Sequence, residues 1–302
     1  MDHQPAFVEE RLAFDGATGD ALVRVPTCGV RAGLVTLHPA SNGRGDQPLF
    51  SHIAETLAPL GVAVLSYDRR PPTAGAADTA LAVQARDAAK AMDALRTRYD
   101  VACGLYGFSQ GAWAAVEAAA RSEPAWLVLL GWSGVSPAEQ MRFHTDELLR
   151  RRGYGDEDRA KALLLRLQLE RFIRSGDGRG GLAAALGEAA GHAWFEHAFL
   201  PARPPSLPTW ADMDVDPTAP IDDIGCPVLA IWGADEECSP PRPGIDALRR
   251  ARSIDMSTVL LPSCGHEPKV GSGDPGDGAN RDDGFSPDYT AALHDWFAER
   301  LG

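Results

Sequence analysis

The chain has 302 residues, 44% of them hydrophobic and 24% charged, which is an ordinary composition for a globular protein able to bury a large core. Its 29 basic and 42 acidic residues give a net charge of −13, which argues against nucleic acid or an anionic membrane as the main partner. No apolar run approaches the roughly 20 residues of a membrane span, and the N-terminus lacks the basic and apolar regions of a secretion signal.

Strands and helices alternate along most of the chain. Short apolar runs indicate buried strands, and longer stretches with helical spacing of apolar residues indicate helices. The predicted strands cover residues 11–14, 21–25, 33–37, 62–65, 101–106, 125–130, 227–232 and 256–260, the first two as an antiparallel hairpin. The predicted helices cover residues 48–60, 76–99, 110–121, 243–252 and 287–301. This order predicts an α/β fold, with a mostly parallel central sheet and helices on both faces.

One connection is too long to be a simple crossover between neighbouring strands. It spans roughly 90 residues between the strands at 125–130 and 227–232, against the 10–12 that a crossover needs. Helical patterns cover residues 139–152, 156–174 and 182–199, and a proline-rich stretch follows. We interpret residues 137–220 as a helical cap inserted into a core domain of residues 1–136 and 221–302. Most of the cap's apolar residues are expected to form its own core, and Trp194 and Phe195 are its best candidates for lining a substrate pocket.

The motif Gly107-Phe108-Ser109-Gln110-Gly111 lies between a predicted strand and a predicted helix. A serine in G-x-S-x-G at a sharp strand-to-helix turn is typical of a nucleophile elbow. The glycines allow the strand and the helix to pass closely, and the helix N-terminus favours negative charge that develops beside the serine. The alternative is an ordinary glycine-rich turn with a capping serine.

The order of elements, this elbow and a late histidine resemble the α/β-hydrolase superfamily, in its capped esterase and serine-aminopeptidase-like branch. The resemblance extends from about residue 22 to residue 301. Three further segments support it: 34–41, which is similar to the strand and oxyanion loop; Tyr67-Asp68-Arg69, which is similar to a turn found in many esterases; and 226–233, which is similar to the strand before the triad acid. The resemblance implies a catalytic triad in the order serine, acid, histidine.

Ser109 needs a base within hydrogen-bonding distance, because a free hydroxyl is barely ionised at neutral pH. His266 follows a predicted strand near the C-terminus, where the resemblance places the base. The acid is ambiguous between two neighbours, Glu236 and Asp235. The spacing in relatives favours Glu236, and a shift of one residue would bring in Asp235.

The oxyanion hole is expected to use two backbone N–H groups. One belongs to Gln110, the residue after the nucleophile. The other comes from the loop after strand 33–37, where Pro39 replaces the usual glycine and has no N–H, so Ala40 is the expected donor. His38 lies in the same loop as a structural residue that also borders the predicted pocket.

The sequence implies neither a metal nor an organic cofactor. Five cysteines are scattered without C-x-x-C spacing, which indicates reduced thiols in a cytoplasmic protein and argues against a zinc site. The glycine-rich stretch at 271–278 lacks the residues of a phosphate loop or an EF-hand, and we interpret it as a surface loop.

These residues predict a serine hydrolase that cleaves a carboxylic ester of a small molecule through an acyl-enzyme on Ser109. A thioester, a lactone or a small amide would suit the same machinery. Acyl transfer, carbon–carbon bond hydrolysis, perhydrolysis and a non-catalytic binding role are the alternatives. A homodimer formed through the cap or an edge strand is left open.

Overall fold

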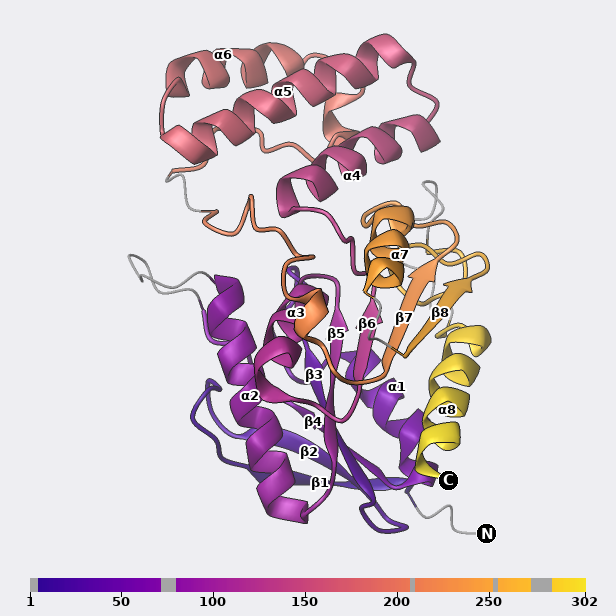
Figure 1. The fold of residues 1–302 in the computed structure, drawn as a ribbon. Coiled ribbons are helices and arrows are strands. Elements are labelled where there is room, and N and C mark those ends of the chain that lie inside the picture. Colours follow the sequence, from indigo (N-terminus) through magenta and orange to yellow (C-terminus); the bar gives the residue numbers. More distant parts are fainter. Residues whose placement is uncertain (1–4, 72–79, 207–209, 252–254, 273–283) are drawn as a thin grey trace.

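The computed structural model describes residues 5–71, 80–206, 210–251, 255–272 and 284–302 (Figure 1). The start of the predicted helix 76–99 and most of the predicted loop 271–278 lie outside the described residues.

Eight strands among the described residues form one sheet in the order β1-β2-β4-β3-β5-β6-β7-β8. Strand β2 runs antiparallel to both β1 and β4, and all other neighbours are parallel, so the predicted mostly parallel sheet is confirmed. The strands are β1 (Phe7–Leu12), β2 (Ala21–Pro26), β3 (Ala32–Leu37), β4 (Val62–Ser66), β5 (Cys103–Phe108), β6 (Leu127–Leu130), β7 (Val228–Gly233) and β8 (Met256–Leu261). The predicted hairpin is present, but its first strand begins at Phe7 rather than at residue 11.

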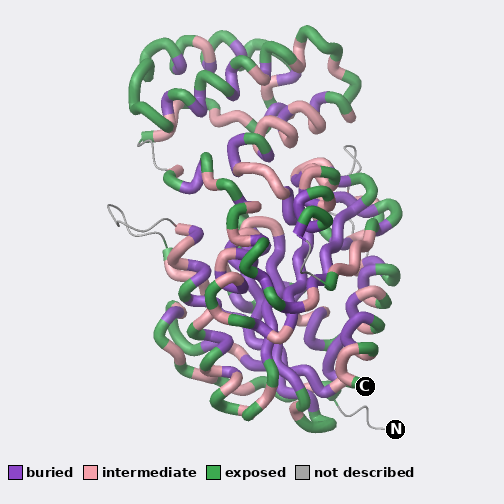
Figure 2. The backbone as a smooth tube through the Cα atoms, viewed as in Figure 1, coloured by how far each residue is buried: buried purple, intermediate pink, exposed green. Residues whose placement is uncertain are grey.

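Helices cover both faces of this sheet, as Figure 1 shows. They are α1 (Pro48–Leu57), α2 (Ala80–Tyr99), α3 (Gln110–Ser122), α7 (Pro241–Arg250) and α8 (Pro287–Leu301). Two separate clusters of buried apolar side chains result. One lies under α2, α3 and α7, and the other lies under α1 and α8. The buried core therefore follows the strands, as the colouring in Figure 2 shows.

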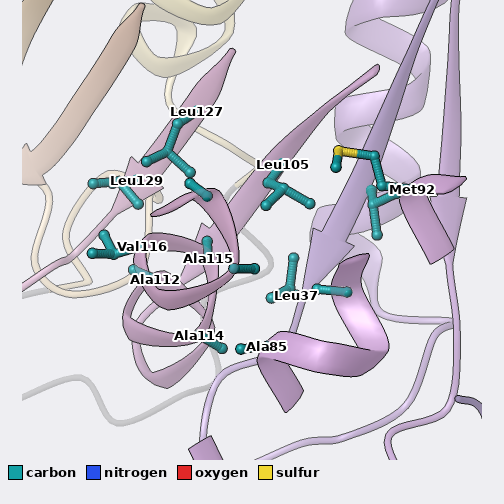
Figure 3. Close-up of a cluster of buried hydrophobic side chains, with 14 of the residues drawn as sticks. Leu37, Ala85, Met92, Leu105, Ala112, Ala114, Ala115, Val116, Leu127 and Leu129 are labelled. Carbon is teal, nitrogen blue, oxygen red and sulfur yellow. The ribbon is translucent and has the colours of Figure 1, made fainter. Parts of the chain in front are cut away.

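Helix α3 approaches the sheet closely because its buried face is made mostly of alanine. Ala112, Ala115 and Val116 lie beside Leu105, Leu127 and Leu129 of the neighbouring strands (Figure 3). Small side chains shorten the distance between the helix axis and the sheet, and the larger leucines fill the remaining space. This packing fixes the N-terminus of α3, which follows Ser109 directly.

The long connection between β6 and β7 forms a helical layer beyond the carboxyl ends of the parallel strands (Figure 1). It contains α4 (Pro137–Arg151), α5 (Asp156–Ser175), α6 (Arg179–Ala189) and the short helix η2 (Phe195–His197), which share an apolar cluster of their own. Helix α4 begins at a capping box in which Ser136 and Glu139 bond to each other's backbone N–H. We call this layer the cap.

The predicted helix 182–199 is wrong at both ends. Helix α6 begins at Arg179, because Gly180 and Gly181 continue the first turn, and it ends at Ala189. The next residues form turns and η2, and Phe199 takes a left-handed backbone with φ of 50°. The apolar spacing beyond Ala189 therefore belongs to turns and to η2 rather than to a continued helix.

The hydroxyls of Tyr106 on β5 and Tyr289 on α8 hydrogen-bond to each other at 2.9 Å, and both side chains are fully buried. Tyr289→Phe would leave the Tyr106 hydroxyl buried without a partner, so we expect a loss of ~1–3 kcal/mol in the free energy of unfolding. The double variant Tyr106→Phe/Tyr289→Phe should lose less than this single variant. Urea denaturation measures both, and a double variant as unstable as the sum of the two singles would contradict the expectation.

Candidate active site

Ser109 occupies a strained turn between β5 and α3. Its φ of 54° and ψ of −117° lie outside the regions that non-glycine residues normally adopt. The backbone N–H of Ser109 donates to Leu130 O on the neighbouring strand at 2.9 Å, which holds the turn against β6. The Ser109 hydroxyl therefore lies beyond the carboxyl end of the sheet.

The two glycines of the motif lie where backbone segments nearly touch. A Cβ added to Gly107 would lie 2.3 Å from Gly111 O, and one added to Gly111 would lie 2.5 Å from Leu37 O. Both distances are far shorter than a van der Waals contact with backbone oxygen. The motif thus has glycine at these positions because β5, α3 and the end of β3 meet there.

His266 follows β8 and lies against Ser109. Its Nε2 accepts a hydrogen bond from Ser109 Oγ at 2.8 Å, and its Nδ1 donates to Glu236 Oε1 at 2.9 Å. Burial would lower the pKa of His266, but the Cys238 sulfur and the Glu236 carboxylate beside it raise this pKa well above its ordinary value. The arrangement can move a proton from the Ser109 hydroxyl to the imidazole.

Glu236, rather than Asp235, contacts the imidazole. Its side chain is 1% exposed, and Oε1 also accepts from the backbone N–H groups of Cys238 at 2.8 Å and Ser239 at 2.9 Å. Burial alone would raise the pKa of Glu236, but the charge of His266 and these hydrogen bonds hold it below its usual value. Asp235 is exposed and reaches this region only through its backbone.

Glu237 also lies against the histidine. Its Oε2 accepts from the backbone N–H of His266 at 3.0 Å, and burial raises the pKa of its carboxyl group. Glu237 thus fixes the backbone of His266, while Glu236 fixes its ring. The sequence analysis did not single out Glu237, because three consecutive acidic residues do not reveal which of them turn inward.

The two expected oxyanion donors belong to different segments of the core. Gln110 is the first residue of α3, and Ala40 lies in the loop after β3. Among the hydrogen bonds of the described residues, neither backbone N–H donates to a protein acceptor. These two N–H groups can therefore donate to a new acceptor, as an oxyanion hole requires.

His38 is anchored within the fold. Its ring is 2% exposed, its Nε2 donates to Tyr67 O at 2.5 Å, and it packs edge-on against Phe50 and Tyr67. Burial lowers the pKa of His38 to about 4, so the ring is neutral near neutral pH. This placement gives His38 a structural role in the oxyanion loop.

The sequence also matches a protein-family profile. The profile described as the alpha/beta hydrolase family matches residues 34–296. The chain belongs to this family. The match spans both parts of the sheet that carry Ser109, Glu236 and His266, together with the cap between them. A comparison with curated proteins finds no match.

Solved structures of other hydrolases share the fold across almost their whole length. A thermophilic esterase from Thermogutta terrifontis has a TM-score of 0.53 at 16% identity, covering 98% of this chain and 100% of that one. Proline iminopeptidase from Mycobacterium smegmatis has a TM-score of 0.54 at 15% identity, covering 97% and 99%. Dienelactone hydrolase from Anabaena variabilis has a TM-score of 0.50 at 15% identity, covering 98% of this chain and 96% of that one.

The cap helix α4 of this hydrolase directly contacts residues 235–238, which we call the acid loop because they include Glu236, the predicted acid. Gln140 Nε2 donates to Cys238 Sγ at 3.2 Å, and His144 Nδ1 donates to Glu237 O at 2.8 Å. Arg151 donates to Asp235 O at 2.8 Å and to Glu236 O at 3.1 Å. Sequence reasoning missed these three side chains, since their helical spacing alone does not show which surface the cap covers.

The two aromatic residues expected at the pocket lie mainly within the cap. Trp194 is 3% exposed and belongs to the cap's apolar cluster, and Phe195 packs against the same cluster. Their role in lining a pocket stays a prediction. Phe199, in contrast, is 61% exposed and packs edge-on against His144, beside the acid loop.

Gly131, after β6, is a further residue that sequence reasoning missed. Its φ is 66°, and a Cβ there would lie 2.9 Å from Cε1 of His266. A side chain at this position would displace the imidazole. The only signal in the sequence is a glycine at the end of a predicted strand, which is common in this chain.

Within the described ranges, no group of three or more His, Cys, Asp or Glu side chains could hold a metal ion. In the same part of the chain, no helix is long and apolar enough to cross a membrane.

Gly107→Ala would push a methyl group into the backbone of α3, where no side chain can rotate away. We expect a loss of ~1–3 kcal/mol in the free energy of unfolding, and weaker reaction of Ser109 with a fluorophosphonate. The matched control is Gly187→Ala on α6, where the added methyl meets nothing within 4 Å and should leave stability unchanged or raise it by ~0.5–1 kcal/mol. Equal effects of the two substitutions on melting temperature would contradict this explanation.

Proposed function

We propose that this protein is a serine hydrolase that cleaves a carboxylic ester of a small molecule through an acyl-enzyme on Ser109. The observation that carries the proposal is the continuous line of hydrogen bonds from Ser109 Oγ through His266 to Glu236, at 2.8 Å and 2.9 Å. Family membership supports it, as does the presence of an esterase and a peptidase among hydrolases of the same fold.

The proposed reaction follows from these positions. His266 Nε2 takes the hydroxyl proton as Ser109 Oγ attacks the acyl carbonyl carbon. The carbonyl oxygen becomes an oxyanion and receives the N–H groups of Gln110 and Ala40. The protonated His266 then gives its proton to the leaving alcohol, and the ester bond breaks. Water, activated by the same imidazole, releases the acid and restores Ser109. Glu236 keeps Nδ1 protonated and stabilises the imidazolium throughout.

A fluorescent fluorophosphonate tests whether Ser109 is activated. We expect wild-type protein to carry one label, Ser109→Ala to carry none, and His266→Ala to react at least ~10³-fold more slowly, because the hydroxyl then lacks its base. Ser122→Ala, at the other end of α3, is the matched control and should label like wild type. Turnover of p-nitrophenyl esters of increasing acyl length, measured in parallel, gives the size of the acyl pocket. A folded wild-type protein with neither label nor turnover would overturn the proposal and favour a binding role.

A second experiment separates Glu236 from its neighbour. Glu236→Gln should reduce kcat by ~10³–10⁴-fold, because the amide does not hold the imidazole in the required tautomer. Asp235→Asn is the matched control, since the Asp235 side chain is exposed and lies away from the ring.

The pH profile gives an independent readout of the same pair. Only neutral His266 can act as the base, so wild-type activity should fall as the pH falls through the raised pKa of His266. Removing the Glu236 charge takes away one of the influences that raise this pKa and leaves the Cys238 sulfur against burial, so the acid limb of residual kcat/KM in Glu236→Gln should move to lower pH. A larger effect of Asp235→Asn than of Glu236→Gln, or an acid limb that moves to higher pH, would contradict the assignment of the acid.

A further inference from the structure

Arg69 contacts both segments that carry the donors of the proposed oxyanion hole. It follows β4, and its own backbone N–H donates to Gly43 O in the oxyanion loop at 2.7 Å. Its guanidinium group makes hydrogen bonds to three residues: Pro39, Ala40 and Gln110.

The contact with Pro39 fixes the direction of one oxyanion donor. Arg69 Nη1 donates to Pro39 O at 3.2 Å, and this carbonyl shares a peptide group with the N–H of Ala40. In a trans peptide the C=O and the N–H point in opposite directions. Holding the Pro39 carbonyl toward Arg69 therefore turns the Ala40 N–H away from it. A second bond, from Nη2 to Ala40 O at 3.3 Å, restrains the next peptide as well.

The contact with Gln110 ties the other oxyanion donor to the same group. Arg69 Nη1 also donates to Gln110 Oε1 at 2.9 Å. The backbone N–H of Gln110 is the donor that follows Ser109 on the elbow. One planar guanidinium thus links the loop that carries Ala40 to the side chain of Gln110, although the two residues are about 70 positions apart in the chain. The direction of the Gln110 N–H itself is set by the elbow and by the first turn of α3.

The charge of Arg69 has no acidic partner in the described part of the chain. All three acceptors are neutral oxygens, and none of the ion pairs formed by described residues includes Arg69. An arginine remains charged in proteins, so a half-buried positive charge stands behind the hole before the reaction begins. When the oxyanion forms, its negative charge stabilises the positive charge of Arg69. An interaction that is stronger in the transition state than in the ground state raises kcat.

We propose that Arg69 is a positioning residue that directs the Ala40 amide, restrains Gln110 through its side chain and places a positive charge beside the oxyanion hole. The bond to Pro39 O also polarises the shared peptide and makes the Ala40 N–H a stronger donor. This inference rests on the proposed serine hydrolase function.

The test compares Arg69→Met, Arg69→Lys and the control Arg44→Met. Arg44 belongs to the same loop region, but its side chain is 64% exposed and pairs with Asp46 and Asp68. We expect Arg69→Met to lower kcat by ~10–100-fold, somewhat less than the loss of a direct oxyanion donor, with KM changed by less than ~3-fold. Arg69→Lys keeps the charge without the planar fork and should recover part of the loss. Arg44→Met should match wild type.

A trifluoromethyl ketone gives the readout that a purely structural role would not move. It forms a tetrahedral adduct with an active serine and places an oxyanion in the hole, so its affinity should fall across the Arg69 variants in proportion to kcat. The double variant Arg69→Met/Gln110→Met should lose less than the product of the two single losses, because both remove the same contact.

Two results would overturn the inference. One is an Arg69→Met protein with wild-type kcat. The other is a loss of kcat that accompanies a lowered melting temperature and leaves the ketone affinity of the folded protein unchanged. Absence of phosphonate labelling at Ser109 in wild type is a separate result. It would overturn the proposed function, and this inference with it.

Discussion

The close approach of three backbone segments at the elbow is the constraint on which the rest of the site depends. The first turn of α3 packs against the end of β3 and the end of β5, with Gly107 and Gly111 at the points of contact. Because α3 begins immediately after Ser109, the serine takes a strained backbone conformation with positive φ, and its Oγ projects beyond the strand. The alanine-rich face of α3 maintains this approach. A helix held further from the sheet would turn the hydroxyl away from His266.

Electrostatics at the site depends on one deeply buried carboxylate. Glu236 is stabilised by the imidazole of His266 and by two backbone N–H groups, so its negative charge persists despite burial. Its charge in turn favours the protonated form of His266, which is the form that arises as Ser109 attacks. Arg69, beside Gln110, carries positive charge without an acidic partner among the described residues. In the proposed mechanism, Glu236 would stabilise the imidazolium and Arg69 would stabilise the oxyanion.

Short sequence motifs predicted the parts of the site whose residues are neighbours in the chain. The elbow and the expected donor Gln110 fall within five residues, and steric contact explains the glycine at each end. The acid could not be decided from the sequence, because Glu236 and Asp235 are adjacent in a loop and only side-chain direction distinguishes them. Contacts of Gln140, His144 and Arg151 depend on how the cap packs, which no periodicity encodes. The helix predicted over residues 182–199 was wrong at its C-terminal end because apolar residues continue past Ala189, where they lie in turns and in η2.

The cap contacts the loop that carries Glu236. Side chains from α4 bind four consecutive residues of the acid loop, from 235 to 238, through two carbonyl bonds from Arg151, one from His144 and a contact from Gln140 to sulfur. A motion that carried α4 away from the core would break these contacts and release the loop that holds Glu236. If the proposed triad acts during turnover, we expect α4 to stay in place while substrate enters. Substitutions on α4 are then expected to shift the Glu236 side chain, and this effect should appear in the pH dependence of activity because Glu236 contacts His266.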